Sequence, residues 1–241
     1  MNGILRKIAA MIPGLAVSVA AAPATDDVDR RWQAAYSARE RYYQAAIGDF
    51  PNDILKLPHM TGVWPGGGLF VMRADKLGRD VWAYSTFGLS NVGMPAPVNR
   101  LAAAPPDDAA GYGFELMVVA RENAEWPLWI LQWATNAEIL AEAGFMDRVE
   151  KHRGVTAAEV KVGPQPADSV NLLISKAQPP LPQGTRLPNG MMEMLIATVI
   201  TDDEMNWSLS NGREALLKKL LAAGIGQIST RVRSSVLAGR Y

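Results

Sequence analysis

The fold is decided by Val81-Trp82-Ala83-Tyr84-Ser85-Thr86-Phe87-Gly88-Leu89-Ser90, a segment whose aromatic residues are typical of a β-strand. Farther along the chain, Gly113-Phe114-Glu115-Leu116 begins a second strand and Trp126-Pro127 begins a helix. Proline suits the first helical position, because its missing N–H group has no intrahelical partner there. This order of elements predicts the skeleton of a mixed α and β domain.

The first strand has an expected partner directly before it in the sequence. Residues 69–73 form a short apolar segment, and Gly78-Arg79-Asp80 is typical of a turn, so the two segments predict a hairpin. Three glycines, Gly66-Gly67-Gly68, precede this hairpin and also raise the alternative of a phosphate-binding loop. That alternative is disfavoured, because no Gly-Lys-Ser/Thr follows and the next element is a strand, whereas phosphates bind at a helix N-terminus.

Further strands are predicted at residues 113–120, 169–177 and 191–200. Asn189-Gly190 precedes the last of them and is a strong hairpin signal. Residues 145–166 are polar and without periodicity, so they are predicted to be irregular. Together these features predict an α+β fold, a single domain with a mainly antiparallel or mixed β-sheet flanked by helices.

The helices differ in how much apolar surface they carry. Residues 25–47 have one apolar and aromatic face, as expected for a helix that packs on a domain. The helix from Trp126 is apolar over more than half of its circumference, so it is predicted to be buried on both sides and to end at Gly144. Thr201-Asp202-Asp203-Glu204 is interpreted as a capping box and less readily as a divalent-cation site, because no later carboxylate completes one. A last helix is predicted at residues 213–223.

Composition limits the classes of partner. The chain has 241 residues, 24 basic and 24 acidic side chains and no cysteine. A balanced charge argues against nucleic acid or an anionic membrane as the main partner, and the lack of cysteine excludes disulfides and thiolate chemistry. Residues 1–24 are either a signal peptide or a flexible tether, and their apolar run is too short for a membrane span. The expected organisation is therefore residues 1–24, a helical segment at 25–58 and the main domain at 59–241.

Catalytic chemistry is sparse. His59 and His152 show no metal-ligand spacing, and no Gly-x-Ser-x-Gly motif is present. Glu115 lies on a partly apolar strand face, where a general acid or base is one interpretation and a paired structural carboxylate the other. We therefore expect a protein that is not an enzyme and needs no cofactor or metal, and that acts by binding another protein.

The ordered landmarks resemble the Suppressor of fused domain family. The resemblance extends over about residues 60–236 and rests on residues 82–90, 111–116 and 126–127, then on 191–204, 211–221, 224–226 and 231–236. No single motif is specific, and the order and spacing of several of them carry the match. The strand after Glu115 is more apolar than is usual in the family, and residues 145–166 have no clear counterpart.

The resemblance implies a non-enzymatic binding domain. Animal relatives hold a transcription factor inactive, and bacterial relatives resemble immunity proteins that neutralise polymorphic toxins. The chain is expected to lack the extra C-terminal domain of the animal proteins and to be a cytoplasmic bacterial immunity protein whose partner is a toxin domain. An exported protein of unknown role and an enzyme using Glu115 stay as alternatives. The residues predicted to contact the partner are Trp64, Trp82, Tyr84, Glu115, Arg231 and Arg233.

Overall fold

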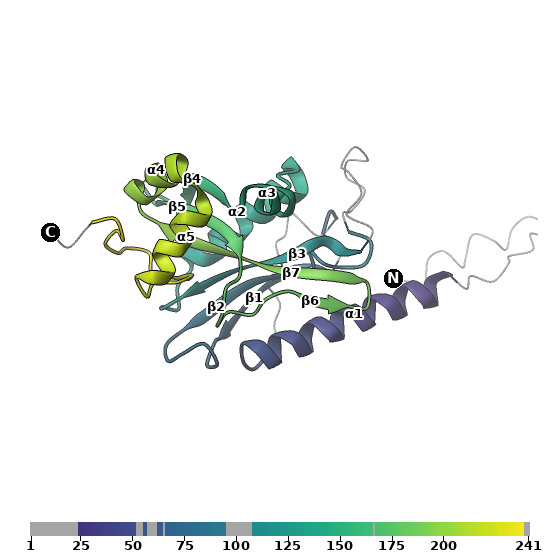
Figure 1. Cartoon of the computed structure of the whole chain (residues 1–241). Helices are drawn as coiled ribbons and strands as arrows, with labels where there is room; N and C mark the ends of the chain where they lie inside the picture. The colour runs from purple at the N-terminus through teal and green to yellow at the C-terminus, as the bar shows by residue number, and fades with distance from the viewer. Residues whose placement is uncertain are drawn as a thin grey trace, which may run out of the picture.

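One mixed β-sheet organises the domain (Figure 1). The computed structural model describes residues 24–51, 55–56, 62–64, 66–94, 108–165 and 167–238. In these ranges the sheet has eight strands: β1 (Gly68–Arg73), β2 (Trp82–Phe87), β3 (Ala109–Ala120), β4 (Val155–Lys161), β5 (Ser169–Lys176), β6 (Thr185–Leu187), β7 (Gly190–Ile200) and β8 (Ile228–Ser229). Five helices accompany them: α1 (Ala24–Ala46), α2 (Trp126–Ala141), α3 (Phe145–His152), α4 (Asp202–Asn211) and α5 (Arg213–Ala222).

The sheet order is β1-β2-β3-β7-β5-β4, with β6 beside β7 and β8 beside β3. The predicted hairpin of β1 and β2 is confirmed, with Phe70 opposite Ser85 in an antiparallel register. The hairpin predicted at Asn189-Gly190 is confirmed by the antiparallel pair of β6 and β7. Only β3 pairs in parallel, with β7 and β8, among the described strands. The α+β class and the mainly antiparallel, mixed sheet are therefore confirmed.

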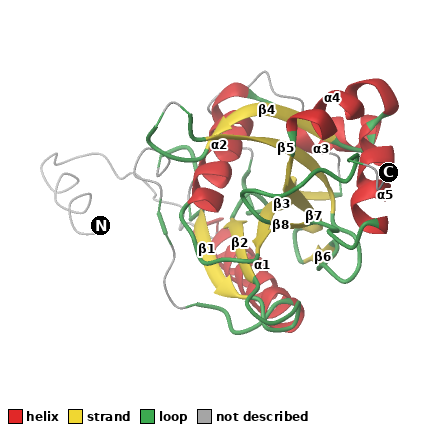
Figure 2. Ribbon diagram, turned by 90° about the vertical axis from the view of Figure 1, so that its left-hand side faces the viewer, coloured by secondary structure: helices red, strands yellow, loops and turns green. Residues whose placement is uncertain are grey.

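The two faces of the sheet bury separate apolar clusters. Phe114, Leu116 and Val118 of β3 belong to the cluster beneath α2 and α3. The alternate residues Met117 and Val119 belong to the cluster that α1 covers. This alternation is the period of two expected of a strand covered on both faces. Figure 2 shows α1 and α2 on opposite sides of β1 and β2.

A third cluster joins α4 and α5 to the sheet. Leu216 and Leu220 of α5 pack with Leu173 of β5 and Ile200 of β7. The predicted capping box at the start of α4 is confirmed, with the N–H of Thr201 donating to Glu204 Oε2 at 3.0 Å. Figure 1 shows this pair of helices at the end of the domain where the C-terminal segment lies.

Residues 145–166 correct the sequence prediction, because they are not irregular. They contain α3 and the edge strand β4. α3 has only eight residues, too few for a clear period, and follows Gly144 in the left-handed region at φ 61°. β4 has a register shift between Ala157 and Val160, and Glu159 between them has φ 53°. A bulge interrupts the apolar alternation by which a strand is recognised in sequence.

The helix α2 brings a second correction, because only one of its faces is buried. Ile130, Leu131 and Ala134 are fully or almost fully buried, whereas Trp129 and Leu140 are exposed. The helix also ends earlier than predicted, since the left-handed residue after it is Glu142 at φ 52°. Gly144 instead precedes α3.

The N-terminal prediction is only partly covered by the described residues. α1 packs on the sheet as expected of residues 25–47, and Leu55 forms an isolated antiparallel bridge with Leu69 of β1. Residues 1–23, 52–54 and 57–61, and with them His59, lie outside the described ranges. Within those ranges, no helix has both the length and the apolar character to cross a membrane.

Candidate functional site

Glu115 lies near the middle of β3, and its side chain has no exposed surface. Its Oε1 accepts hydrogen bonds from the N–H of Gly88 at 2.8 Å and from the N–H and Oγ of Ser90 at 3.0 and 2.6 Å. Its Oε2 accepts from Thr86 Oγ1 at 2.7 Å and from the N–H of Leu89 at 3.3 Å. The carboxylate therefore fixes the turn that follows β2, and its oxygens are occupied by bonds that hold the fold together.

Arg39 of α1 reaches the same turn from the other side and is also fully buried. Its guanidinium donates to Ser90 Oγ at 2.8 Å and to Asn91 Oδ1 at 2.5 Å, and lies 3.7 Å from Glu115 Oε1. It also stacks over the ring of Phe87, 4.3 Å from the centroid. Burial lowers the pKa of Arg39, and the nearby Glu115 carboxylate opposes that shift.

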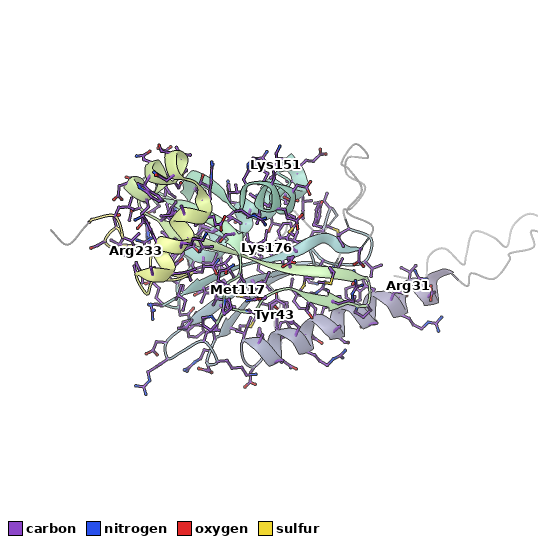
Figure 3. All side chains as sticks on the ribbon, viewed as in Figure 1. Arg31, Tyr43, Met117, Lys151, Lys176 and Arg233 are labelled. Atoms are coloured by element: carbon purple, nitrogen blue, oxygen red, sulfur yellow. The ribbon has the colours of Figure 1, made fainter. Side chains whose placement is uncertain are left out.

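The ion pair of Arg39 and Glu115 joins α1 to the central strand β3. Tyr43, one turn farther along α1, adds a hydrogen bond of 2.7 Å between its hydroxyl and Ser85 Oγ. Figure 3 shows Tyr43 and Met117 between α1 and the sheet. The arrangement supports the structural interpretation of Glu115, because a buried carboxylate with these partners has no free oxygen facing a cleft.

The aromatic residues predicted to contact a partner are mostly inside the domain. Trp64 is 2% exposed and packs against the backbone of Gly67. Tyr84 is also buried, and its hydroxyl accepts a hydrogen bond of 2.8 Å from the N–H of Ala124. Trp82 is half-buried at the edge of the apolar cluster beneath α2. Contact with a partner through Trp64 or Tyr84 would require this conformation to open.

The two predicted arginines tie the C-terminal segment to the domain. Arg231 pairs with Asp168 at 2.5 Å while its side chain stays 41% exposed. Arg233, labelled in Figure 3, donates from its two terminal nitrogens to the two carboxylate oxygens of Glu204, at 2.6 and 2.5 Å. The N–H of Val236 donates to the same carboxylate at 2.8 Å. Burial acts to raise the pKa of Glu204, but the bonds from Arg233 and Val236 outweigh it, so the pKa lies below its usual value.

The six predicted residues therefore do not form one surface. Trp64, Tyr84 and Glu115 are buried, Arg233 is nearly so, and Trp82 and Arg231 keep part of their surface exposed. Their role in partner binding stays a prediction.

A surface that the sequence interpretation missed lies on α2. Trp129, Trp133, Asn136 and Leu140 recur at spacings of four, three and four residues, so they share one side of the helix, here called the α2 outer face. Trp129 is 37% and Leu140 is 49% exposed. Trp133 is half-buried against Phe145, with ring centroids 5.9 Å apart. The spacing was visible in the sequence, but apolar residues cover more than half of the circumference of the helix, so the pattern did not separate its inner face from its outer face.

The charge around the α2 outer face is one-sided. Residues 122–147 contain five carboxylates and no lysine or arginine, although the whole chain is balanced. Glu122 and Glu125 precede the helix, and Glu142 follows it; all three are exposed. Glu138 is buried and accepts a hydrogen bond of 3.0 Å from the N–H of Phe145, where α3 begins. The flanking basic residues are Arg121, directly before Glu122, and Arg148, on α3.

A small cleft lies elsewhere, between the end of β5 and the hairpin of β6 and β7. It has a volume of about 350 Å³, and its lining includes Lys176, Gln178 and Glu193. The Lys176 ammonium, labelled in Figure 3, lies 3.3 Å from carboxylate oxygens of both Glu193 and Glu150. The described residues hold no group of three histidine, aspartate or glutamate side chains that is placed to bind a metal.

Comparisons with known proteins agree with this fold. The family profile of the Suppressor of fused protein (SUFU) matches residues 67–234. Three crystal structures share the fold at low identity. A chain of the Sufu–Fu complex has a TM-score of 0.51 and 16% identity over 84% of this chain and 92% of its own. A SUFU homologue from Neisseria gonorrhoeae has a TM-score of 0.53 and 16% identity over 86% and 97%.

The third structure, Drosophila Suppressor of Fused, has a TM-score of 0.54 and 17% identity over 86% of this chain. The match extends over 51% of the Drosophila protein. No curated protein matches the chain in sequence. Because the family profile matches well over half of the sequence, the chain belongs to the Suppressor of fused (SUFU) family.

Proposed function

We propose that this domain is a non-enzymatic protein-binding module, and that it acts as a cytoplasmic immunity protein that neutralises a bacterial toxin by direct binding. The observation that carries the proposal is the exposure of Trp129 and Leu140 on the same side of α2. Exposed aromatic and aliphatic side chains inside a polar rim are the usual anchors of protein interfaces.

Two further findings support protein binding over catalysis. The most buried charged pair, Arg39 and Glu115, is engaged in bonds that fix the turn after β2. In the Sufu–Fu complex, a protein of the same fold is bound to another protein. The homologue from Neisseria gonorrhoeae supports a bacterial setting, since it matches this chain over 97% of its own length.

The test is co-purification with the toxin domain encoded by a neighbouring gene. The two full chains, mixed at micromolar concentration, are expected to co-migrate as a stoichiometric complex in size-exclusion chromatography and to restore growth of cells that express the toxin. A toxin domain from an unrelated locus is the control. Separate elution of the cognate pair, with no rescue of growth, would refute the toxin-binding function.

Localisation has a separate test. The N-terminal sequence of the natural protein is expected to begin at Met1 or at the residue after it. A protein that begins near residue 25 would instead favour the exported alternative, because residues 1–24 would then be a removed signal peptide.

A further inference from the structure

We propose that the α2 outer face binds a basic amphipathic helix of the partner protein. This inference rests on the proposed function, since it specifies where the partner docks and what chemistry it brings.

The spacing of the side chains fits a helix as the occupant. Trp129, Trp133, Asn136 and Leu140 follow a pattern of four, three and four residues, which is the seam that a second helix meets when two helices pack side by side. At a rise of about 1.5 Å per residue, Trp129 and Leu140 stand roughly 16 Å apart along the axis. Two exposed anchors at this separation match three turns of a partner helix.

The charges identify the occupant as basic. The sequence has no lysine or arginine between Arg121 and Arg148, and Glu125 and Glu142 are exposed just beyond the two ends of α2. Lysine and arginine side chains flanking an apolar stripe would meet these carboxylates as they pack. A second copy of this chain is disfavoured on the same surface, because two copies of an acidic segment would repel each other.

The C-terminal end of α2 also favours a cation from the partner. Its last turn has no basic residue, although the partial negative charge of a helix C-terminus favours cations there. Glu138 and Glu142 instead add negative charge at this end, and Glu138 is already turned inward to the N–H of Phe145. Arg148 of α3 already acts on the buried Glu138, so the exposed Glu142 is the carboxylate at this end of α2 that a cation of the partner would meet.

The experiment uses the full chain and a labelled peptide of about 18 residues, long enough for five helical turns. Its leucines lie on one face and lysines fill the rest; a scrambled peptide and a glutamate-for-lysine peptide are the comparisons. Fluorescence anisotropy is expected to show that the basic helical peptide binds at least about tenfold more tightly than either comparison peptide. Equal binding by the acidic peptide would overturn the proposal.

Variants locate the site. Combining Trp129→Ala with Leu140→Ala should weaken peptide binding by at least about tenfold, as expected for interface anchors. Leu209→Ala is the control, because Leu209 is an exposed leucine on another helix, α4, at 57% against 49% for Leu140. Circular dichroism checks that each variant is folded. Unchanged binding by the α2 variant, or equal weakening by the control, would contradict the assignment.

A second pair of variants tests the carboxylates at the two ends of α2. Glu125→Lys with Glu142→Lys should weaken binding of the basic peptide at low salt by about tenfold, and added salt should narrow the difference. Asp29→Lys with Asp49→Lys is the control, since both residues are exposed near the two ends of α1. The same loss in both double variants would mean that only overall charge matters and would overturn the proposal.

The outcomes separate this inference from the proposed function. A cognate toxin that binds the α2 variants as tightly as the wild type would leave the function standing and remove the docking site. If the peptide binds at α2 but no toxin complex forms, the docking site would stand and the proposed toxin-binding function would be refuted. Sedimentation that shows a dimer lost with Trp129→Ala would identify a second copy as the occupant and overturn the proposal.

Discussion

Replacing Glu115 by glutamine tests how the domain is held together. The change keeps the shape of the side chain but removes its charge and turns one of its two acceptors into a donor. N–H groups of the turn after β2 would then face an NH₂ group, and Arg39 would stay buried without a counter-charge. Removing one partner of a buried pair costs about 3–5 kcal/mol. We expect Glu115→Gln to lower the free energy of unfolding by this amount, out of roughly 5–15 kcal/mol for a typical domain.

A double-mutant cycle separates the pair from the rest of the network. Arg39→Met alone removes the bonds to Ser90 and Asn91, and leaves the carboxylate with its neighbouring donors. We expect that change to cost about 3 kcal/mol. The double variant leaves neither charge alone, so its loss should fall short of the sum of the single losses by at least about 1 kcal/mol.

The assay is urea unfolding at pH 7, followed by tryptophan fluorescence and far-ultraviolet circular dichroism. A Glu115→Gln protein that stays within about 1 kcal/mol of the wild type would refute the reasoning, and so would strictly additive losses. The result also bears on the alternative that Glu115 is catalytic. Because the side chain supports the fold, loss of a cellular phenotype in this variant counts as evidence for catalysis only if the protein is still folded.

Two further perturbations test local features. Gly67→Ala should destabilise the domain by about 1–3 kcal/mol through overpacking, because the added Cβ would lie 2.1 Å from the Trp64 ring, whereas Gly62→Ala, with nothing within 4 Å, should be nearly neutral by the same urea assay. Glu204 has a lowered pKa in the folded state, so its contribution to stability is present above its usual pKa of about 4.3 and is lost as the pH falls below it. Urea unfolding at pH 7 and at about pH 3.5 should show a larger loss in the wild type than in Arg233→Met, and equal losses would contradict this assignment.

Local patterns predicted much of the fold. The residues from Gly113 onward identified a strand, Asn189-Gly190 identified a hairpin, and Thr201 with Glu204 identified the start of α4. The burial of both faces of that strand appeared only in the structure. Each of these signals depends on residues that are close in sequence. α3 and β4 were missed because a helix of eight residues and an edge strand with a bulge offer too few periodic positions.

The internal contacts of the buried polar groups could not be predicted, because they join distant parts of the chain. Arg39 and Glu115 are 76 residues apart, and nothing near either residue indicates its partner. Arg233 and Glu204 are 29 residues apart, and the sequence predicted a partner contact for Arg233 and a helix cap for Glu204 but not their bond to each other. Buried charges are uncommon, so charged residues in a sequence are ordinarily assigned to the surface.

Charged side chains are ordinarily exposed and large apolar ones buried, but the two helices that flank the central strands each carry an exception. α1 is the more polar helix, yet it turns Arg39 fully inward, while the more apolar α2 leaves Trp129 and Leu140 exposed. The arginine stabilises the fold only together with Glu115, so any change to it should alter unfolding. Trp129 is 37% and Leu140 is 49% exposed, so each still buries half or more of its surface, and truncating either should lower stability by about 1–2 kcal/mol, less than the change at Arg39. We propose that the buried pair of Arg39 and Glu115 serves stability and that the α2 outer face serves partner binding. A Trp129→Ala variant that lost as much stability as Arg39→Met does would show that the α2 outer face belongs to the core.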